Sequence, residues 1–319
     1  MQRPKLSAEQ MAHLKSEKAW VQPTLLLGIY GSFMAMVYGL RYMQESGFPL
    51  WSMIAAGLLA ALITAGLQSH ILILLHEGAH GHLAKNKTLN EFLGNVLCAY
   101  PFFMFARVYK YFHLDHHRYG GTEKDPEISA YRNLKISYEG HSMKEIAVIF
   151  IRGLSGIVSQ KLTISMYKYY FEKKKNQGAQ SLGFYELAGM PLFWAAVIAG
   201  GLHFGILAEI LLIWFGASFL SGFFLMLHGI GEHNGVLGGA EWDRTYNHDF
   251  SFLANFFIYP IKSGFHIEHH LFPTIPWYNV EKLRAILAEN KAYSSSIETN
   301  TLDGYFFGKK TVFHTQLKK

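Results

Sequence analysis

The chain of 319 residues is 50% hydrophobic but only 16% charged, whereas soluble domains average about 25% charged residues. So few charges cannot cover a 36.2 kDa globule with an ordinary water-facing surface, which argues against a soluble protein. The single cysteine, Cys98, excludes an intrachain disulfide framework and a cysteine-rich zinc finger. The net charge of +6 and the 17 histidines become informative only once they are placed along the chain.

Four segments that are almost free of charge predict transmembrane helices. Residues 20–40 and 50–75 contain no charged side chain, and residues 187–231 contain only Glu209. About 20 apolar helical residues cross a hydrocarbon core, so these segments predict spans at 20–42, 50–75, 185–202 and 206–228. Buried helices of a soluble protein are the alternative, but they seldom run past about 20 residues without a charge.

Two further apolar segments are too interrupted to cross a membrane. Residues 89–112 are rich in aromatic residues and contain Pro101, while residues 143–171 contain Arg152 and Lys161. Both patterns are typical of helices that lie in the membrane interface. The sequence therefore predicts an all-α integral membrane protein, with one domain over residues 1–319 whose core is about 20–290.

The distribution of basic residues predicts the topology. With four spans, both termini and the segment 76–184 share one side, which carries 28 of the 29 Lys and Arg residues. The positive-inside rule places this side in the cytoplasm, of either a bacterial inner membrane or an endoplasmic reticulum. The first 19 residues are polar and do not form a cleavable signal peptide.

Eight histidines form three short clusters on this cytoplasmic side. The clusters read HEGAH, HLDHH and HIEHH, and their histidines are His76 and His80; His113, His116 and His117; and His266, His269 and His270. Residues three and four apart share one face of a helix, so each cluster presents its imidazoles together. Since one zinc ion takes only three or four protein ligands, eight imidazoles suit two metal ions.

The residue types do not name the metal, because imidazole serves Zn, Cu, Fe and Ni alike. Each cluster also carries an acid, namely Glu77, Asp115 or Glu268. Such acids commonly accept the other ring N–H of a ligand and fix its tautomer, and we expect this role for all three.

A ninth ligand is expected in the sequence HGIGEHN, which begins at the end of the fourth span. His233 is the better candidate, because it lies beyond the membrane edge beside an acid, Glu232, to which we assign the same tautomer-fixing role. His228, five residues earlier, is the alternative ligand.

At this point the sequence resembles the membrane fatty acid desaturase family, within the larger desaturase–hydroxylase superfamily. The resemblance covers roughly residues 20–290 and is carried by four motifs: HEGAH (76–80), HLDHHRYGGTEKDPE (113–127), GEHNG (231–235) and HIEHHLFPTIPWYN (266–279). The order and spacing of the three histidine clusters are highly specific. One H-x-x-H-H motif alone would be weak.

The resemblance implies four spans capped by a cytoplasmic domain that binds two non-heme iron ions through the nine histidines, with no catalytic residue beyond these ligands. Some relatives place an asparagine four residues before the histidine that matches His233. Here this position is Gly229, so a water would complete the ligand set.

The resemblance also implies the reaction. O2 is the co-substrate, and the chain that loses hydrogen is an acyl or isoprenoid chain entering from the lipid. The sequence contains no His-Pro-Gly-Gly heme motif, so electrons come from a separate ferredoxin or cytochrome b5-type protein. The basic cytoplasmic face suits such an acidic partner or anionic lipid, and we expect no nucleic-acid partner.

Two alternative functions remain. Residues 76–80 also match the H-E-x-x-H motif of intramembrane zinc metalloproteases, with Glu77 as general base, but this explains at most three of the histidines. Closer alternatives within the superfamily are a carotenoid ketolase or hydroxylase and a lipid hydroxylase. Features that resemble the ketolases are His80-Gly81, the stretch from Gly121-Thr122 to Asp125-Pro126, and Pro276-Trp277. Features that resemble the acyl desaturases are Leu271-Phe272-Pro273 and Gly231-Glu232-His233.

Overall fold

Four long helices dominate the computed structural model, which describes residues 4–16, 18–136, 143–233, 245–289, 293 and 298–299. Within these residues, four single helices are long and apolar enough to cross a membrane, and each coincides with one of the predicted spans: α2 (Val21–Glu45), α3 (Leu50–Ala79), α9 (Phe184–His203) and α10 (Leu207–His233). Helices α3 and α10 continue past the predicted ends at residues 75 and 228. The additional residues include His76 at the end of α3 and His233 at the end of α10.

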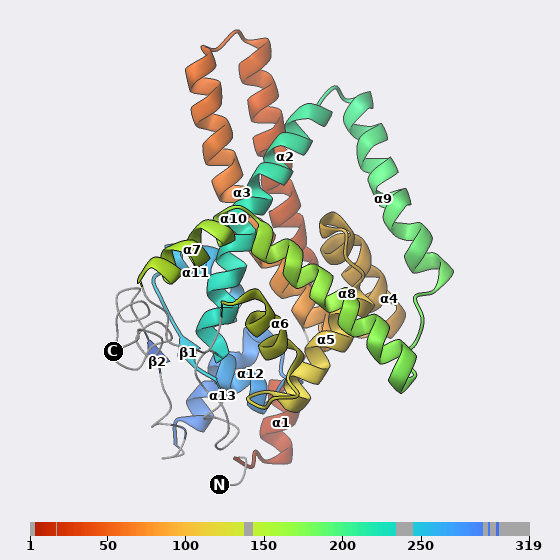
Figure 1. Ribbon diagram of the computed structural model, residues 1–319, viewed down its shortest axis with the longest axis vertical. Coiled ribbons are helices and arrows are strands. Elements are labelled where there is room, and N and C mark those ends of the chain that lie inside the picture. Colours follow the sequence, from red (N-terminus) through yellow and green to blue (C-terminus); the bar gives the residue numbers. More distant parts are fainter. Residues whose placement is uncertain are drawn as a thin grey trace.

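Glycine residues close the two outer turns between these helices. Gly47 follows α2 with a φ of 71°, and Gly205 follows α9 with a φ of 67°. Residues with a side chain rarely adopt this left-handed conformation, so glycine lets each helix end sharply before the next begins. The connections are short, and α2 and α3 therefore lie side by side as an antiparallel pair (Figure 1).

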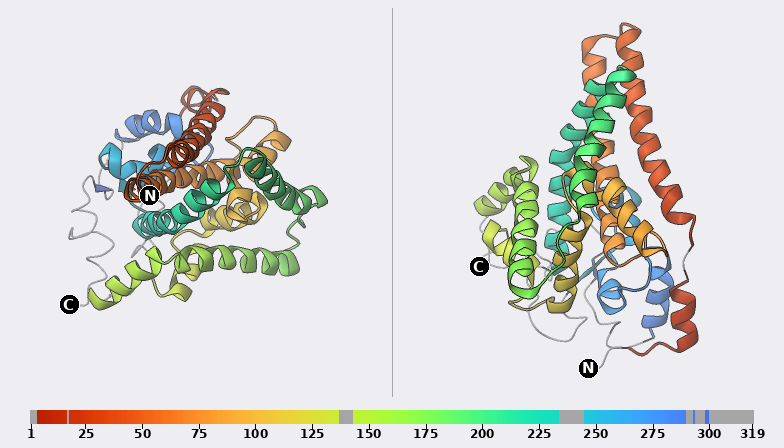
Figure 2. Two further views of the ribbon diagram at one scale, coloured as in Figure 1. Left: turned by 90° about the horizontal axis from the view of Figure 1, so that it is seen from above. Right: turned by 90° about the vertical axis from the view of Figure 1, so that its right-hand side faces the viewer.

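Helices α3 and α10 form the centre of the bundle and pack along each other. Helix α2 covers one side of α3, while α9 leans away from the other helices and makes few contacts (Figures 1 and 2). The central contact is apolar, but it includes an amide between the helices. Gln68 on α3 donates to the carbonyl oxygen of Trp214 at 2.8 Å and accepts from Ser221 at 2.7 Å.

The two segments predicted to lie in the interface are each a bent pair of helices. Residues 87–102 form α4 (Lys87–Leu93), the π-helical turn η1 (Gly94–Ala99) and the 3₁₀ turn η2 (Tyr100–Phe102), and they meet α5 (Ala106–Tyr119) at 97°. Helix α7 (Met143–Leu154) meets α8 (Ile157–Gln177) at a bend of 76°. The second histidine cluster lies within α5.

Short elements form a cap at one end of the bundle. They are α1 (Ala8–Leu14), α6 (Pro126–Leu134), β1 (Asn247–His248), η4 (Pro260–Lys262), α12 (His266–Leu271), η5 (Trp277–Asn279), α13 (Val280–Leu287) and β2 (Glu298–Thr299). Helix α11 (Phe252–Phe257) lies instead against the middle of α3, where Phe256 faces Gly66. The strands β1 and β2 pair in parallel over two residues, which the sequence did not predict. Leu14 of α1 is fully buried against α12 and α13, so the segments before the first span and after the last meet at this end.

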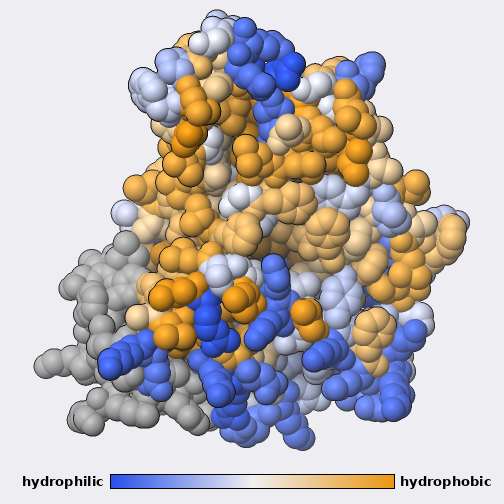
Figure 3. Space-filling view, turned by 45° about the horizontal axis from the view of Figure 1, so that its top comes forward, coloured by the Kyte–Doolittle hydropathy of each residue, from blue (hydrophilic) through white to orange (hydrophobic). Residues whose placement is uncertain are grey.

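The surface matches this division into bundle and cap. Figure 3 shows a broad apolar band over the bundle, with polar side chains at the top and along the lower edge. Large apolar side chains such as Leu58, Leu192 and Leu212 are more than two-thirds exposed. Such a band is suited to contact with lipid rather than with water.

Candidate metal centre

All nine predicted ligands lie in the described part of the chain and come from four helices. His76 lies in the last turn of α3 and His80 caps its end, while α5 carries His113, His116 and His117. His233 is the last residue of α10, and α12 carries the remaining three histidines. The residues that follow His233 in the GEHNG motif lie outside the described residues.

The nine histidines form two groups in space. The potential ligand atoms within each group lie within 4.8 Å of one another, and among the described residues neither group includes His228. The five-histidine group contains His76, His80, His113, His117 and His269, and the four-histidine group contains His116, His233, His266 and His270. The second and third histidine clusters each contribute to both groups, so the two groups are neighbours.

The Nε2 atoms of each group converge. In the five-histidine group, His113 Nε2 lies 2.8 Å from that of His80 and 3.0 Å from that of His117. In the four-histidine group, His266 Nε2 lies 2.8 Å from that of His233 and 3.0 Å from that of His270. Nitrogen ligands about 2.1 Å from one ion are separated by roughly 3 Å, so these separations fit shared coordination.

Five of the nine imidazoles are held in the neutral form that a metal requires. Burial is the main cause and neighbouring imidazoles add to it: together they lower the pKa well below its ordinary value for His80, His113, His117, His269 and His270. Neutral imidazole is the form that coordinates a cation. The donor set therefore fits two divalent transition-metal ions, including iron.

Glu77 and Glu232 lie beside imidazoles of the two histidine groups. Glu77 Oε1 lies 3.4 Å from His76 Nδ1, and Glu232 Oε1 lies 3.0 Å from His266 Nδ1. His228 lies 2.9 Å from the same oxygen of Glu232, and its other nitrogen lies 2.7 Å from the carbonyl oxygen of Ile258. His228 is thus placed to support Glu232, and the alternative that His228 is itself a ligand finds no support.

Asp115 and Glu268 point away from the ligand nitrogens, contrary to the expectation. Asp115 accepts hydrogen bonds from Tyr169 and Lys173 on α8. Glu268 is fully buried and accepts from Asn247 at 2.8 Å, as well as from Arg284 and Tyr293. A helical residue next to ligands faces another side of the helix, so these acids join α5 and α12 to their neighbours instead.

Two carboxylates that the sequence reasoning missed contact His116. Both oxygens of Asp125 lie 3.0 Å from His116 Nδ1, and Glu127 Oε2 lies 3.3 Å from it. Burial opposes protonation of His116, but the two carboxylates outweigh it and raise its pKa to about 9. The signal available in the sequence was Asp125-Pro126, a typical helix start that fixes the Asp125 side chain as the N-cap of α6.

Gly229, the position where some relatives place an asparagine, is in close contact with a tyrosine. A Cβ atom at residue 229 would lie 1.7 Å from the hydroxyl oxygen of Tyr131 and 3.3 Å from Glu127 Oε1. Tyr131 also forms a side-chain hydrogen bond with Glu127. Glycine is required at residue 229 because Tyr131 and Glu127 fill the space that a side chain would take.

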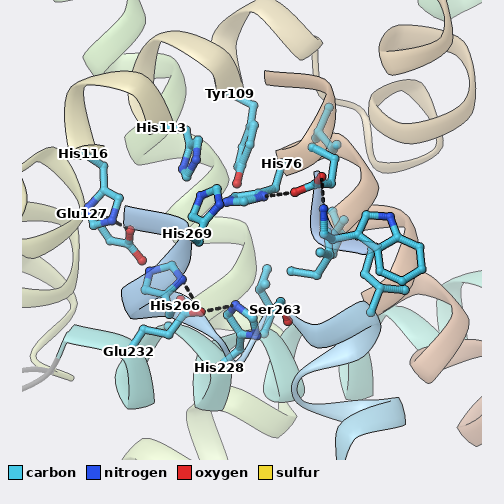
Figure 4. A pocket seen from close by; sticks show the side chains of 18 of the residues that line it. His76, Tyr109, His113, His116, Glu127, His228, Glu232, Ser263, His266 and His269 are labelled. Atoms are coloured by element: carbon cyan, nitrogen blue, oxygen red, sulfur yellow. Dashed lines mark hydrogen bonds and ion pairs between the residues drawn. The ribbon is translucent and has the colours of Figure 1, made fainter. Parts of the chain in front are cut away.

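A cavity of about 120 Å³ contacts both histidine groups. Figure 4 shows His76, His113 and His269 of the five-histidine group and His116 and His266 of the four-histidine group around it. Apart from these polar groups the wall is mainly apolar, with contributions from Leu72, Phe112, Leu162, Met166, Phe272 and Ile275. The cavity is suited to an apolar molecule beside both histidine groups.

Comparisons with known proteins agree with the site. The profile of the fatty acid desaturase family matches residues 49–300, which include all nine histidines. A relative from Bradyrhizobium elkanii, dihydrorhizobitoxine desaturase, is 28% identical over 250 residues, which cover 74% of this chain and 69% of the relative.

Proposed function

Because the chain belongs to the fatty acid desaturase family, and is thus an oxidoreductase with membrane helices, we propose that it is a di-iron acyl-chain desaturase. It is a single desaturase domain in which the nine histidines of the two groups are the iron ligands. The observation that carries the proposal is the mainly apolar cavity in contact with both histidine groups.

The residues of the chain position the substrate and protect the reaction. The apolar wall binds the acyl chain and excludes water, which limits competing reactions of a strong oxidant. Asp125 and Glu232 fix the Nδ1 sides of His116 and His266, so that the Nε2 atoms face the metal. When bound, the iron pair supplies the reduction of O2 to two waters, which consumes two hydrogen atoms from the acyl chain and two electrons and two protons from outside.

The external electrons come from a ferredoxin or a cytochrome b5-type protein. In the predicted topology, the side that carries the histidines also carries 28 of the 29 Lys and Arg residues of the sequence, which supports an acidic partner there. The same asymmetry supports a cytoplasmic position for the catalytic cap and for both termini, in a bacterial inner membrane or the endoplasmic reticulum. The bent pairs α4–α5 and α7–α8 lie in the interface on this side.

Other functions receive less support. Family membership favours an oxidoreductase over a zinc metalloprotease, and His76 and His80 lie in a group with three further histidines. A lipid hydroxylase or a carotenoid ketolase or hydroxylase would use the same metal site. These functions differ from desaturation in the product, which gains oxygen instead of losing two hydrogens.

Untargeted lipid mass spectrometry tests the proposal in cells that express either the wild type or His269→Ala. A lipid that loses two hydrogens only with the wild type supports acyl desaturation and identifies the substrate. A lipid or carotenoid that gains oxygen in the same histidine-dependent way would contradict desaturation and favour the hydroxylase or ketolase alternatives.

A further inference from the structure

Carboxylates surround the two histidine groups unequally. In the four-histidine group, Asp125 and Glu127 both contact His116 Nδ1, at 3.0 and 3.3 Å, and Glu232 contacts His266 Nδ1 at 3.0 Å. Among the residues that the structure describes, the five-histidine group has one such contact, at 3.4 Å between Glu77 and His76. From this difference we propose that the four-histidine group is the tighter of the two metal sites and binds its ion first.

The fold holds the three carboxylates in place before any ion arrives. Asp125 is fully buried and caps α6 by accepting from the backbone N–H of Glu127 at 2.8 Å. Glu232 is 4% exposed and is supported by His228. The hydroxyl of Tyr131, seated against Gly229, holds Glu127 beside His116 (Figure 4 shows Glu127, Glu232 and His228).

A carboxylate that accepts from Nδ1–H strengthens the Nε2 atom of the same ring as a donor, and loss of such a partner commonly lowers metal affinity about 10- to 100-fold. Its negative charge also attracts the cation directly, with little screening in a buried site. The fifth histidine favours the other group, but a neutral imidazole adds no charge. The four-histidine group has three adjacent carboxylates and the five-histidine group has one, so the four-histidine group should bind its ion first.

Anaerobic titration of the metal-free, full-length protein with ferrous iron tests this order, with bound iron measured by equilibrium dialysis. This inference rests on the proposed function only in taking the ions to be iron, and the titration uses no substrate, O2 or electron donor. We expect two equivalents, the first bound at least tenfold more tightly. His116→Ala should remove the tight step, and His80→Ala should weaken only the second.

Asp125→Asn is the sharpest variant, because asparagine caps a helix as well as aspartate and preserves the fold while it removes the charge. It should weaken the first step about 10- to 100-fold. Glu123→Gln is the matched control, since Glu123 is exposed on the same loop and pairs with Arg132, and it should change neither step. Two equal steps in the wild type, or an unchanged first step in Asp125→Asn, would overturn the inference. Ordered binding without lipid desaturation would contradict the proposed function alone.

Discussion

Helices α3 and α9 are both able to cross a membrane, yet they have different roles in the molecule. In the apolar 18-residue segment of each helix, 61% of α3 is buried inside the protein, whereas only 6% of α9 is buried. Helix α3 contains the buried polar residues Thr64, Gln68 and Ser69 and ends in two predicted ligands, whereas no predicted ligand lies on α9. The comparison teaches that apolar length identifies a span, while buried polar residues identify the span that builds the site.

The comparison is tested most strongly at the ends of the two helices, because each carries a histidine there. His80→Ala removes a predicted ligand and should lower desaturase activity at least 100-fold, with a loss of bound iron. His203→Ala, at the end of α9, should leave activity and iron content within twofold of the wild type, since this histidine makes an edge-to-face contact with its neighbour Phe204 and is no predicted ligand. Activity and the iron content of the purified variants are the measurements. Equal losses in the two variants would refute the division of roles.

A glycine on each helix tests the packing. A Cβ atom at Gly66 of α3 would lie 2.1 Å from the ring of Phe256, so Gly66→Ala should destabilise the fold by about 1–3 kcal/mol. Gly200 of α9 faces open space, so Gly200→Ala should be neutral or slightly stabilising. Unfolding in detergent measures both free energies. A destabilised Gly200→Ala would show that α9 is packed more closely than the structure indicates.

A smaller effect is expected from the amide between α3 and α10. Gln68→Leu removes its hydrogen bonds to Trp214 and Ser221 and should cost about 1 kcal/mol, since polar contacts between helices in membranes are modest. Leu192→Ala on the exposed face of α9 is the control and should stay within about 0.5 kcal/mol. The same unfolding assay ranks the two variants, and the reverse order would break the comparison.

Much of this architecture was predictable from the sequence. The absence of charge located the four spans, because a charged side chain in hydrocarbon is costly wherever it lies along the helix. Helical spacing identified the residues of each histidine cluster, because three- and four-residue intervals place imidazoles on one face. The sharp bends between α4 and α5 and between α7 and α8 were not foreseen, because they depend on packing against distant segments.

The division of the ligands was beyond sequence reasoning. His113 and His117 belong to one group and His116, between them, to the other, which depends on how α5 is placed between α3 and α12. The carboxylate partners of the histidines could not be predicted for the same reason, because they depend on how the helices are placed. Asp115 and Glu268 are adjacent to ligands in sequence but face other elements, while Asp125 reaches His116 only because the start of α6 folds back on α5.

Metal analysis of the purified protein shows whether the two histidine groups hold two iron ions, as we propose. We expect two iron ions per chain in the wild type, with Mössbauer spectra that resolve two nitrogen-coordinated sites. One metal ion per chain, or two zinc ions in a protein with full desaturase activity, would contradict it.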